Sequence, residues 1–113
     1  MEDIEFKEGT LKHLQDYVAY KIRKRGFEDE TLHERLLLLT EEIGELVKAC
    51  RHISGMNVDK NREAKHEVGK EVTDVINMIF AVAIELGLDV EKEFIEKEKI
   101  VDQRTYERAK NEK

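Results

Sequence analysis

The sequence contains no proline, no tryptophan and only one cysteine, Cys50. A lone cysteine forms no disulfide within its chain, and the place of Cys50 among apolar residues at helical spacing predicts a core residue rather than a nucleophile. No apolar run approaches the roughly 20 residues that a membrane-spanning helix needs. The first residues, MEDIEFKEG, are acidic and lack a secretory or transit pattern. We therefore expect a cytoplasmic protein that does not associate with a membrane.

The chain also lacks the marks of two nucleotide-binding and nucleic-acid-binding classes. Its six glycines form neither GxGxxG nor GxxxxGK followed by Ser or Thr, so neither glycine-rich phosphate loop is present. Lys and Arg number 20 against 26 Asp and Glu, which gives a net charge of −6. A general nucleic-acid-binding surface needs a basic excess, so we expect no nucleic-acid polymer as a partner. A length of 113 residues suits a single domain.

Apolar residues recur at helical spacing, without the alternation of a strand, and predict four helices. The expected helices cover about 11–25, 32–54, 62–85 and 90–109, with an irregular lead-in at 1–9 and a frayed tail at 110–113. Thr31 and Glu34 have the spacing of a capping box, Thr10 and Asp89 are expected N-caps, and Gly26 is an expected C′ residue. Further candidate helix ends are Gly55, Asn57, Asp59, Asn61 and Gly87. The predicted fold class is all-α, a four-helix antiparallel bundle.

The third expected helix contains the segment 75–84, VINMIFAVAI, which is apolar nearly all round. A helix of that character is buried on every side. A single small chain can hardly wrap it, so we expect dimerisation to complete the bundle. Asn77 is the one polar residue in the segment, and it is either a buried structural amide or a substrate contact. The expected buried positions of the fourth helix are Phe94, Ile95, Ile100 and Val101.

Acidic residues flank the apolar stripes of the second and third helices. The stripe of the second helix is Leu36, Leu39, Ile43, Leu46, Val47, Cys50 and Ile53. On a wheel of about 100° per residue, Glu42 and Glu45 lie beside this stripe, whereas Glu41 points nearly opposite. Glu71 and Asp74 form part of a similar acidic edge on the third helix.

The two acidic pairs are expected to meet. The short connection SGMNVDKN makes the two helices antiparallel neighbours. At a rise of about 1.5 Å per residue, both pairs lie at about the same distance from the turn. Crowded carboxylates repel unless they are paired or bind a metal, and a hard cation such as Mg²⁺ or Mn²⁺ prefers their oxygens. Nearly one residue in four is acidic, so spacing alone is weak evidence and the matched mid-helix position carries the prediction.

The pattern Glu41-Glu42-x-x-Glu45 followed by Glu71-x-x-Asp74 resembles the signature of the all-α nucleoside triphosphate pyrophosphohydrolases, the MazG-like superfamily. The resemblance runs over about 36–94, about half of the chain, and includes EVTDVINMIFAVAIELGLDVEKEF. It implies that Glu42, Glu45, Glu71 and Asp74 hold Mg²⁺. It further implies a homodimer or a dimer of dimers that cleaves a nucleoside triphosphate between the α and β phosphates, releasing a monophosphate and pyrophosphate.

In that reaction the metal activates a water molecule, and Glu41 or Glu45 orients or deprotonates it. Many relatives carry a Lys-Asn pair ahead of an arginine and an aromatic residue near the C-terminus, whereas this chain has Ile100-Val101 before Arg104. The candidate phosphate contacts in this segment are therefore Lys97, Lys99 and Arg104. Met78 stands where many relatives have an aromatic residue near the base, so the resemblance does not imply a base preference.

Three alternatives remain open from the sequence. A carboxylate-bridged di-iron bundle uses paired Glu-x-x-His motifs, and the chain has Glu30 with His33 and Glu63 with His66. A non-catalytic helical dimer that serves as a binding or regulatory module is the second alternative. The third is a phosphoribosyl-ATP pyrophosphohydrolase, although those enzymes usually show Tyr-His where this chain has Asn77-Met78.

Overall fold

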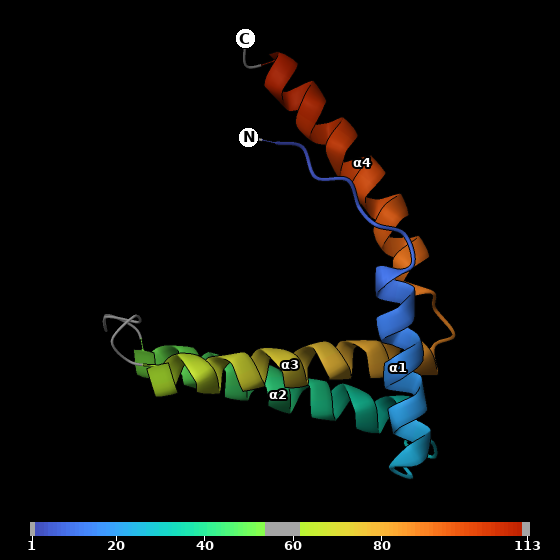
Figure 1. Cartoon of the computed structure of the whole chain (residues 1–113), viewed down its shortest axis with the longest axis vertical. Helices are drawn as coiled ribbons and strands as arrows, with labels where there is room; N and C mark the ends of the chain where they lie inside the picture. Colours follow the sequence, from blue (N-terminus) through green and yellow to red (C-terminus); the bar gives the residue numbers. More distant parts are fainter. Residues whose placement is uncertain (1, 54–61, 112–113) are drawn as a thin grey trace.

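A computed structural model describes the backbone of residues 2–53 and 62–111, and the side chains of 2–53 and 63–105. It contains four helices, α1 (Thr10–Lys24), α2 (Leu32–Ile53), α3 (Arg62–Glu85) and α4 (Val90–Asn111), and no strand within the described ranges (Figure 1). The prediction of an all-α fold is confirmed. Among the described residues, no helix combines the length and apolar character needed to cross a membrane.

Most of the described helix ends follow local sequence signals. The capping box is confirmed: the Glu34 N–H donates to Thr31 Oγ1 at 3.1 Å, and the Thr31 N–H donates to Glu34 Oε1 at 3.2 Å. Asp89 caps α4 by accepting the Lys92 N–H at 3.2 Å. Gly26 and Gly87 follow α1 and α3 with φ of 80° and 69°, a left-handed conformation that glycine adopts without steric cost. The other candidate ends, Gly55, Asn57, Asp59 and Asn61, lie outside the described residues.

The start of α1 differs from the prediction. Thr10 is the first helical residue rather than the N-cap, and Gly9 takes the cap position with φ of 91° and no side-chain cap of its own. The cap comes instead from α4, where the Glu91 carboxylate accepts N–H groups of Gly9 at 2.9 Å, Leu11 at 3.1 Å and Lys12 at 3.3 Å. A carboxylate at a helix N-terminus also interacts favourably with the helix dipole. A side chain from the other end of the chain therefore replaces the expected local cap.

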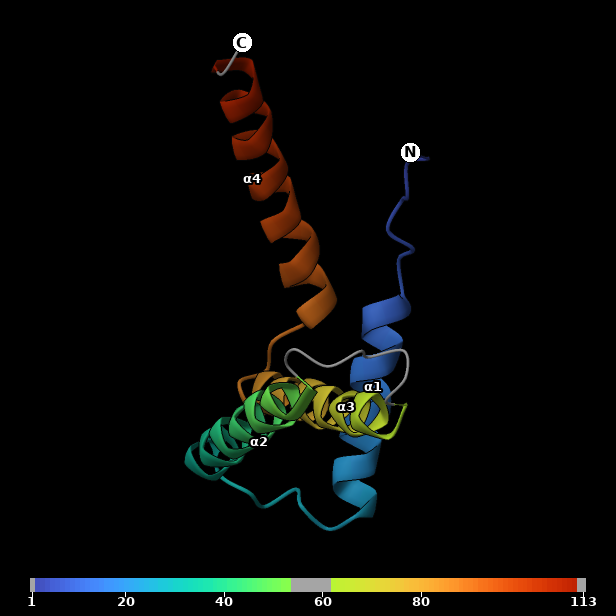
Figure 2. The same ribbon diagram turned by 90° about the vertical axis from the view of Figure 1, so that its left-hand side faces the viewer.

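The helices do not close into a bundle within one chain. α2 and α3 form a long antiparallel hairpin, α1 crosses it near the carboxyl end of α3, and α4 projects away from it (Figures 1 and 2). The radius of gyration is 17.8 Å. A compact domain of this length would have a radius of gyration of about 13 Å. The four predicted helices are present, but their antiparallel closure is not achieved by a single copy.

The small core lies where α1 meets the amino end of α2 and the carboxyl end of α3. Its buried apolar side chains are Val18, Phe80, Ala81 and Ala83. Arg35 lies among them with only 2% of its surface exposed. Its guanidinium donates to the carbonyls of Ala81 at 2.8 Å and Phe27 at 3.3 Å, and lies 3.5 Å from the Glu85 carboxylate. The sequence does not predict a role for Arg35, because no local pattern distinguishes it from a surface arginine.

Much of the apolar surface predicted to be buried is exposed in the single chain. Cys50 is exposed, so its prediction as a core residue is wrong for this chain. Half-buried positions of α2 instead recur at 39, 42, 46, 49 and 53, the seven-residue spacing of a helix that packs along one neighbour. The apolar stripe is wider than the surface that α3 covers. The large apolar side chains of α2, α3 and α4 left exposed include Leu36, Ile43, Val47, Val72, Ile76, Ile79, Phe94, Ile100 and Val101, whereas Ile95 is half-buried.

Candidate metal centre

Three carboxylates meet at the middle of the hairpin. Glu42 comes from α2, and Glu71 and Asp74 come from α3. Each offers an oxygen atom, and these atoms lie within 4.8 Å of one another. Glu42 occupies one of the half-buried positions of α2, and Glu71 and Asp74, three residues apart, are neighbours on one side of α3. The sequence therefore placed these three acids correctly relative to one another. We call Glu42, Glu71 and Asp74 the acid trio.

The acid trio is electrostatically uncompensated. Burial, followed by the negative charges of Asp74, Glu71, Glu45 and Glu41, raises the pKa of the Glu42 carboxyl above its ordinary value. Within the described part of the chain, no Lys, Arg or His forms an ion pair with a member of the trio. Glu42 and Glu71 are half-buried and Asp74 is exposed. Half-buried carboxylates without cationic partners are costly. The three oxygen donors of the trio suit a hard divalent cation, which would keep further coordination positions for water or substrate.

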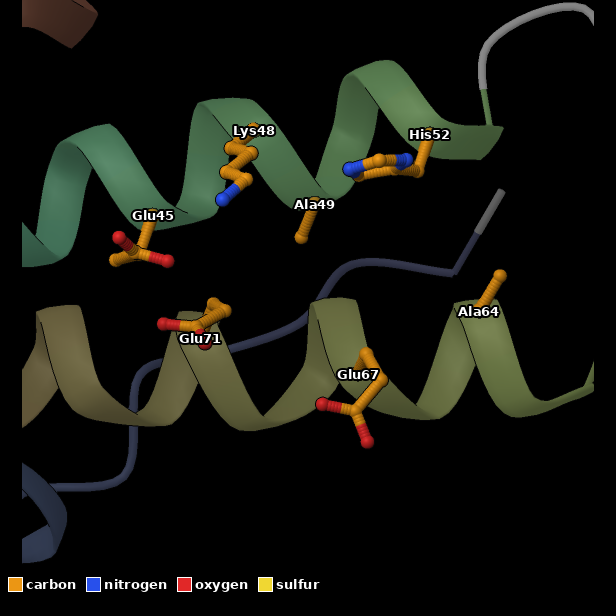
Figure 3. A pocket seen from close by; sticks show the side chains of 7 residues that line it. All are labelled: Glu45, Lys48, Ala49, His52, Ala64, Glu67 and Glu71. Atoms are coloured by element: carbon orange, nitrogen blue, oxygen red, sulfur yellow. The ribbon is translucent and has the colours of Figure 1, made fainter.

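Glu45 and Glu41 lie near the trio but outside it. Glu45 is exposed on α2 and, with Glu71, lines a pocket of about 260 Å³ between α2 and α3. Figure 3 shows the Glu45 and Glu71 side chains in the space between the two helices. The same pocket is lined by Lys48, Ala49, His52, Ala64 and Glu67. Glu41 is exposed on α2, in agreement with its position opposite the apolar stripe.

A larger cavity of about 640 Å³ lies on the other side of the trio, between α1 and the hairpin. Asn77 lines this cavity and is exposed. Of its two predicted roles, that of a buried structural amide is therefore wrong. Met78, the residue at the expected aromatic position, lines the same cavity.

The candidate phosphate contacts lie elsewhere in the single chain. Lys97, Lys99 and Arg104 are all exposed on α4. Because α4 projects away from the hairpin, this segment is separated from the acid trio (Figure 1). The structure thus gathers three of the four predicted metal ligands, places Glu45 beside them, and leaves the three cations of α4 apart.

The two Glu-x-x-His pairs lie near opposite ends of the hairpin. Glu30 and His33 stand at the start of α2, and Glu63 and His66 stand in the first turns of α3. In an antiparallel hairpin the two helix starts are far apart. Neither pair contributes to the acid trio, and the described residues offer no metal-ligating group of three or more that contains either pair.

No protein-family model matches the chain, and no curated protein matches it.

Proposed function

We propose that the protein is a Mg²⁺-dependent nucleoside triphosphate pyrophosphohydrolase of the cytoplasm. The observation that supports this most is the acid trio, three oxygen donors within 4.8 Å at the residues where the motif resembles that of the MazG-like superfamily. Mn²⁺ has similar preferences and is the alternative cofactor. A pocket of about 260 Å³ lies on one side of the trio and a cavity of about 640 Å³ on the other, and together they leave room for a nucleotide.

In the proposed reaction the cation would be held by Glu42, Glu71 and Asp74. It would neutralise phosphate oxygens and make bound water a better nucleophile. Glu45 lines the same pocket as Glu71 and accepts a proton from the attacking water. Glu41 helps to orient this water. Oxygen from water bonds to the α phosphorus while the bond to the bridging oxygen of the β phosphate breaks. Nucleoside monophosphate and pyrophosphate leave. Positioning and charge neutralisation supply most of the catalysis in phosphoryl transfer.

The proposed enzyme is a homodimer or a dimer of dimers. One chain exposes 9425 Å². A compact protein of this mass would expose about 6,500 Å². The difference of about 3,000 Å² exceeds what one subunit usually contributes to an obligate dimer, about 1,000–2,500 Å². The exposed apolar residues of α2, α3 and α4 would supply such an interface. In the proposed oligomer, Lys97, Lys99 and Arg104 of the projecting α4 would approach the acids of another copy.

The proposal is tested by incubating the protein with a panel of canonical and damaged nucleoside triphosphates, and with phosphoribosyl-ATP, in the presence of Mg²⁺ or Mn²⁺. We expect monophosphate and pyrophosphate in equal amounts, with ¹⁸O from labelled water in the monophosphate. Release of inorganic phosphate instead, or no turnover of any substrate with either metal, would refute the proposed reaction. Iron analysis of the purified protein tests the di-iron alternative in parallel.

A non-catalytic binding module is the second candidate. The observation that favours it is the separation of the α4 cations from the acid trio in the single chain. Such a module would bind nucleotides in a metal-dependent way without converting them. Calorimetric titration of Mg²⁺-nucleotide, combined with the product assay, separates the two functions.

A further inference from the structure

α4 takes its orientation from α1 rather than from the hairpin to which it is connected. Among the described residues, α1 is the helix that packs against α4, which projects away from α2 and α3 (Figures 1 and 2). The connection between α3 and α4 consists of residues 86–89. Connections of about two to five residues commonly join two antiparallel helices. The length of this connection would therefore allow α4 to fold back along its own hairpin, so other contacts hold it away.

Gln15 of α1 binds the connection with both ends of its side-chain amide. Its Nε2 donates to the Leu88 carbonyl at 2.8 Å, and its Oε1 accepts the Val90 N–H at 2.9 Å. Only 8% of the Gln15 surface is exposed, and a hydrogen bond is electrostatically stronger away from water. One buried side chain of α1 thus fixes both the end of the connection and the first residue of α4.

Glu91 extends this junction by one residue along α4. Its two carboxylate oxygens accept the Gly9 N–H at 2.9 and 3.0 Å, and one of them also accepts the N–H groups of Leu11 and Lys12. The N-cap residue Gly9 supplies no side-chain cap of its own. Hydrogen bonds to a charged acceptor are stronger than those between neutral groups. The start of α1 is therefore satisfied by α4, and the two helix starts are joined by charge-assisted bonds.

The junction continues into the segment that precedes α1. The rings of Phe6 and Phe94 have centroids 5.6 Å apart, within the range of favourable aromatic pairs (Figure 1). As the residue number falls from 15 through 9 to 6, the number of its partner rises from 88 through 91 to 94. Residues 6–15 therefore run antiparallel to the start of α4 and hold it at successive points.

This junction keeps two exposed apolar surfaces of the chain apart. On α4, Phe94 and Ile100 are 44% and 48% exposed, and on the hairpin, Val47 and Ile79 are 53% and 48% exposed. α3 has 24 residues and α4 has 22, so the lengths of the two helices agree to within about 3 Å. A folded-back α4 would have the length to cover its own hairpin, whereas an extended α4 can cover only the hairpin of another copy.

We propose that Glu91 and Gln15 form a latch that keeps α4 from folding back, so that its apolar side packs on the hairpin of a second copy of the chain. This inference rests on the homo-oligomer of the proposed function and adds the contacts that decide between closure within one chain and closure between two. One chain exposes 9425 Å², about 3,000 Å² more than a compact protein of its mass. That surplus is sufficient for an interface with a second copy.

Glu93 provides a matched control for Glu91. Both acids stand in the first turn of α4, so removal of either one changes the net charge and the interaction with the helix dipole in the same way. Glu93 is exposed and takes no part in the latch. The experiment compares the wild type with Glu91→Ala and Glu93→Ala in the absence of metal and nucleotide. Sedimentation velocity over a range of protein concentrations measures the dissociation constant of the oligomer.

Spin labels measure the direction of α4 within one chain. They are attached at Lys70→Cys on α3 and Asp102→Cys on α4, both exposed positions, in a Cys50→Ser background. If α4 folded back, these positions would lie at similar distances from the connection, about 22 and 18 Å along their helices. Labelled protein is mixed with an excess of unlabelled protein, so that pulsed electron paramagnetic resonance reports distances within one chain.

We expect one long distance between the labels in the wild type. Glu91→Ala should add a shorter distance and weaken self-association about tenfold or more, the effect of losing a hydrogen bond to a charged group. Glu93→Ala should keep the long distance and a dissociation constant within about twofold of the wild type. Equal behaviour of the two variants, or no change in Glu91→Ala, would overturn the latch. A wild type that shows the short distance, or that stays monomeric at every concentration, would overturn the second copy as the occupant.

Circular dichroism checks that the variants keep their helices. If Glu91→Ala loses helical content, Glu91→Gln takes its place, because this change keeps the shape of the side chain and removes its charge, and Glu93→Gln becomes the control. The outcomes are separate from those of the enzymatic proposal, since neither measurement contains a nucleotide or a metal. Failure of the latch would leave the pyrophosphohydrolase reaction standing, and absence of turnover would leave the latch standing.

Discussion

Arg35 and Glu42 stand seven residues apart on the same side of α2, yet their charges are balanced in different ways. Arg35 is buried, donates to the carbonyls of Phe27 and Ala81, and lies 3.5 Å from the Glu85 carboxylate. Glu42 is half-buried, and the charges that shift its pKa are all negative. The Arg35 guanidinium is bound by groups of the same chain and connects three segments of the fold. The Glu42 carboxylate has no cationic partner in the described part of the chain.

The largest expected effect is on turnover, and it tests the acids around Glu42. Asp74→Asn and Glu45→Gln should each lower kcat by about 1,000-fold or more, equivalent to about 4 kcal/mol of transition-state stabilisation. The helical content should be unchanged, because neither side chain is buried. Glu96→Gln, which removes an exposed acid from α4, should keep wild-type turnover. Full activity of Asp74→Asn or Glu45→Gln would remove that residue from the proposed site.

Substitution of Arg35 should lower the stability of the folded protein. Arg35→Met keeps most of the side-chain volume but removes the hydrogen bonds to the Phe27 and Ala81 carbonyls and the contact with the Glu85 carboxylate. We expect the free energy of unfolding to fall by about 3 kcal/mol, measured by urea denaturation at a fixed protein concentration. The exposed Arg51 on the same helix is the control, and Arg51→Met should stay within about 0.5 kcal/mol of the wild type. An Arg35→Met protein as stable as the wild type would show that these contacts are dispensable.

Binding of a divalent cation should neutralise part of the negative charge at Glu42 and stabilise the folded state. A ligand that binds only the folded state at 100 times its Kd stabilises by about 2.7 kcal/mol. Mg²⁺ should therefore raise the Tm of the wild type and leave that of Asp74→Asn nearly unchanged. Scanning calorimetry with Mg²⁺, Mn²⁺ and a chelator measures the effect. A Tm of the wild type that is indifferent to both metals would contradict the metal site.

The smallest expected effect is a pH dependence of the metal-free protein. The folded state raises the pKa of Glu42 above its ordinary value of 4.5, so this group binds its proton more tightly in the folded than in the unfolded chain. Its favourable contribution to stability is fully present below pH 4.5 and is lost as the pH rises through the raised pKa. Glu42→Gln should therefore be more stable than the wild type at pH 7 in chelator and lose this advantage at pH 4. Parallel stability profiles of the two proteins from pH 4 to 7 would exclude the effect.

Local patterns were sufficient to predict the helices and three of the four acids that were expected to meet, whereas the fourth, Glu45, lies outside the trio. The Thr31–Glu34 capping box and the glycines after α1 and α3 act within a few residues, and the spacing of Glu42, Glu71 and Asp74 follows from helix periodicity and one short turn. These features depend on neighbours in the sequence or on a single hairpin. They are therefore visible to any argument from periodicity and capping.

Contacts between distant segments could not be predicted from local patterns. The cap of α1 joins Gly9 to Glu91, which are 82 residues apart, and no local signal marks Glu91 as its partner. The burial of Arg35 depends on where α1 crosses the hairpin. The exposure of Cys50 has the same origin, since an apolar stripe specifies that a face avoids water and leaves open which neighbour covers it.

The contacts of Glu91 near the start of α4 fix the direction in which this long helix projects. α4 has 22 residues, which at about 1.5 Å per residue makes it about 33 Å long. A rotation of about 10° at its base, where Glu91 holds the first turn of α1 and Gln15 bonds Leu88 and Val90, would move its far end by about 6 Å. That displacement is about one helical turn. Two side chains near the pivot thus determine which surface the distant tip can reach.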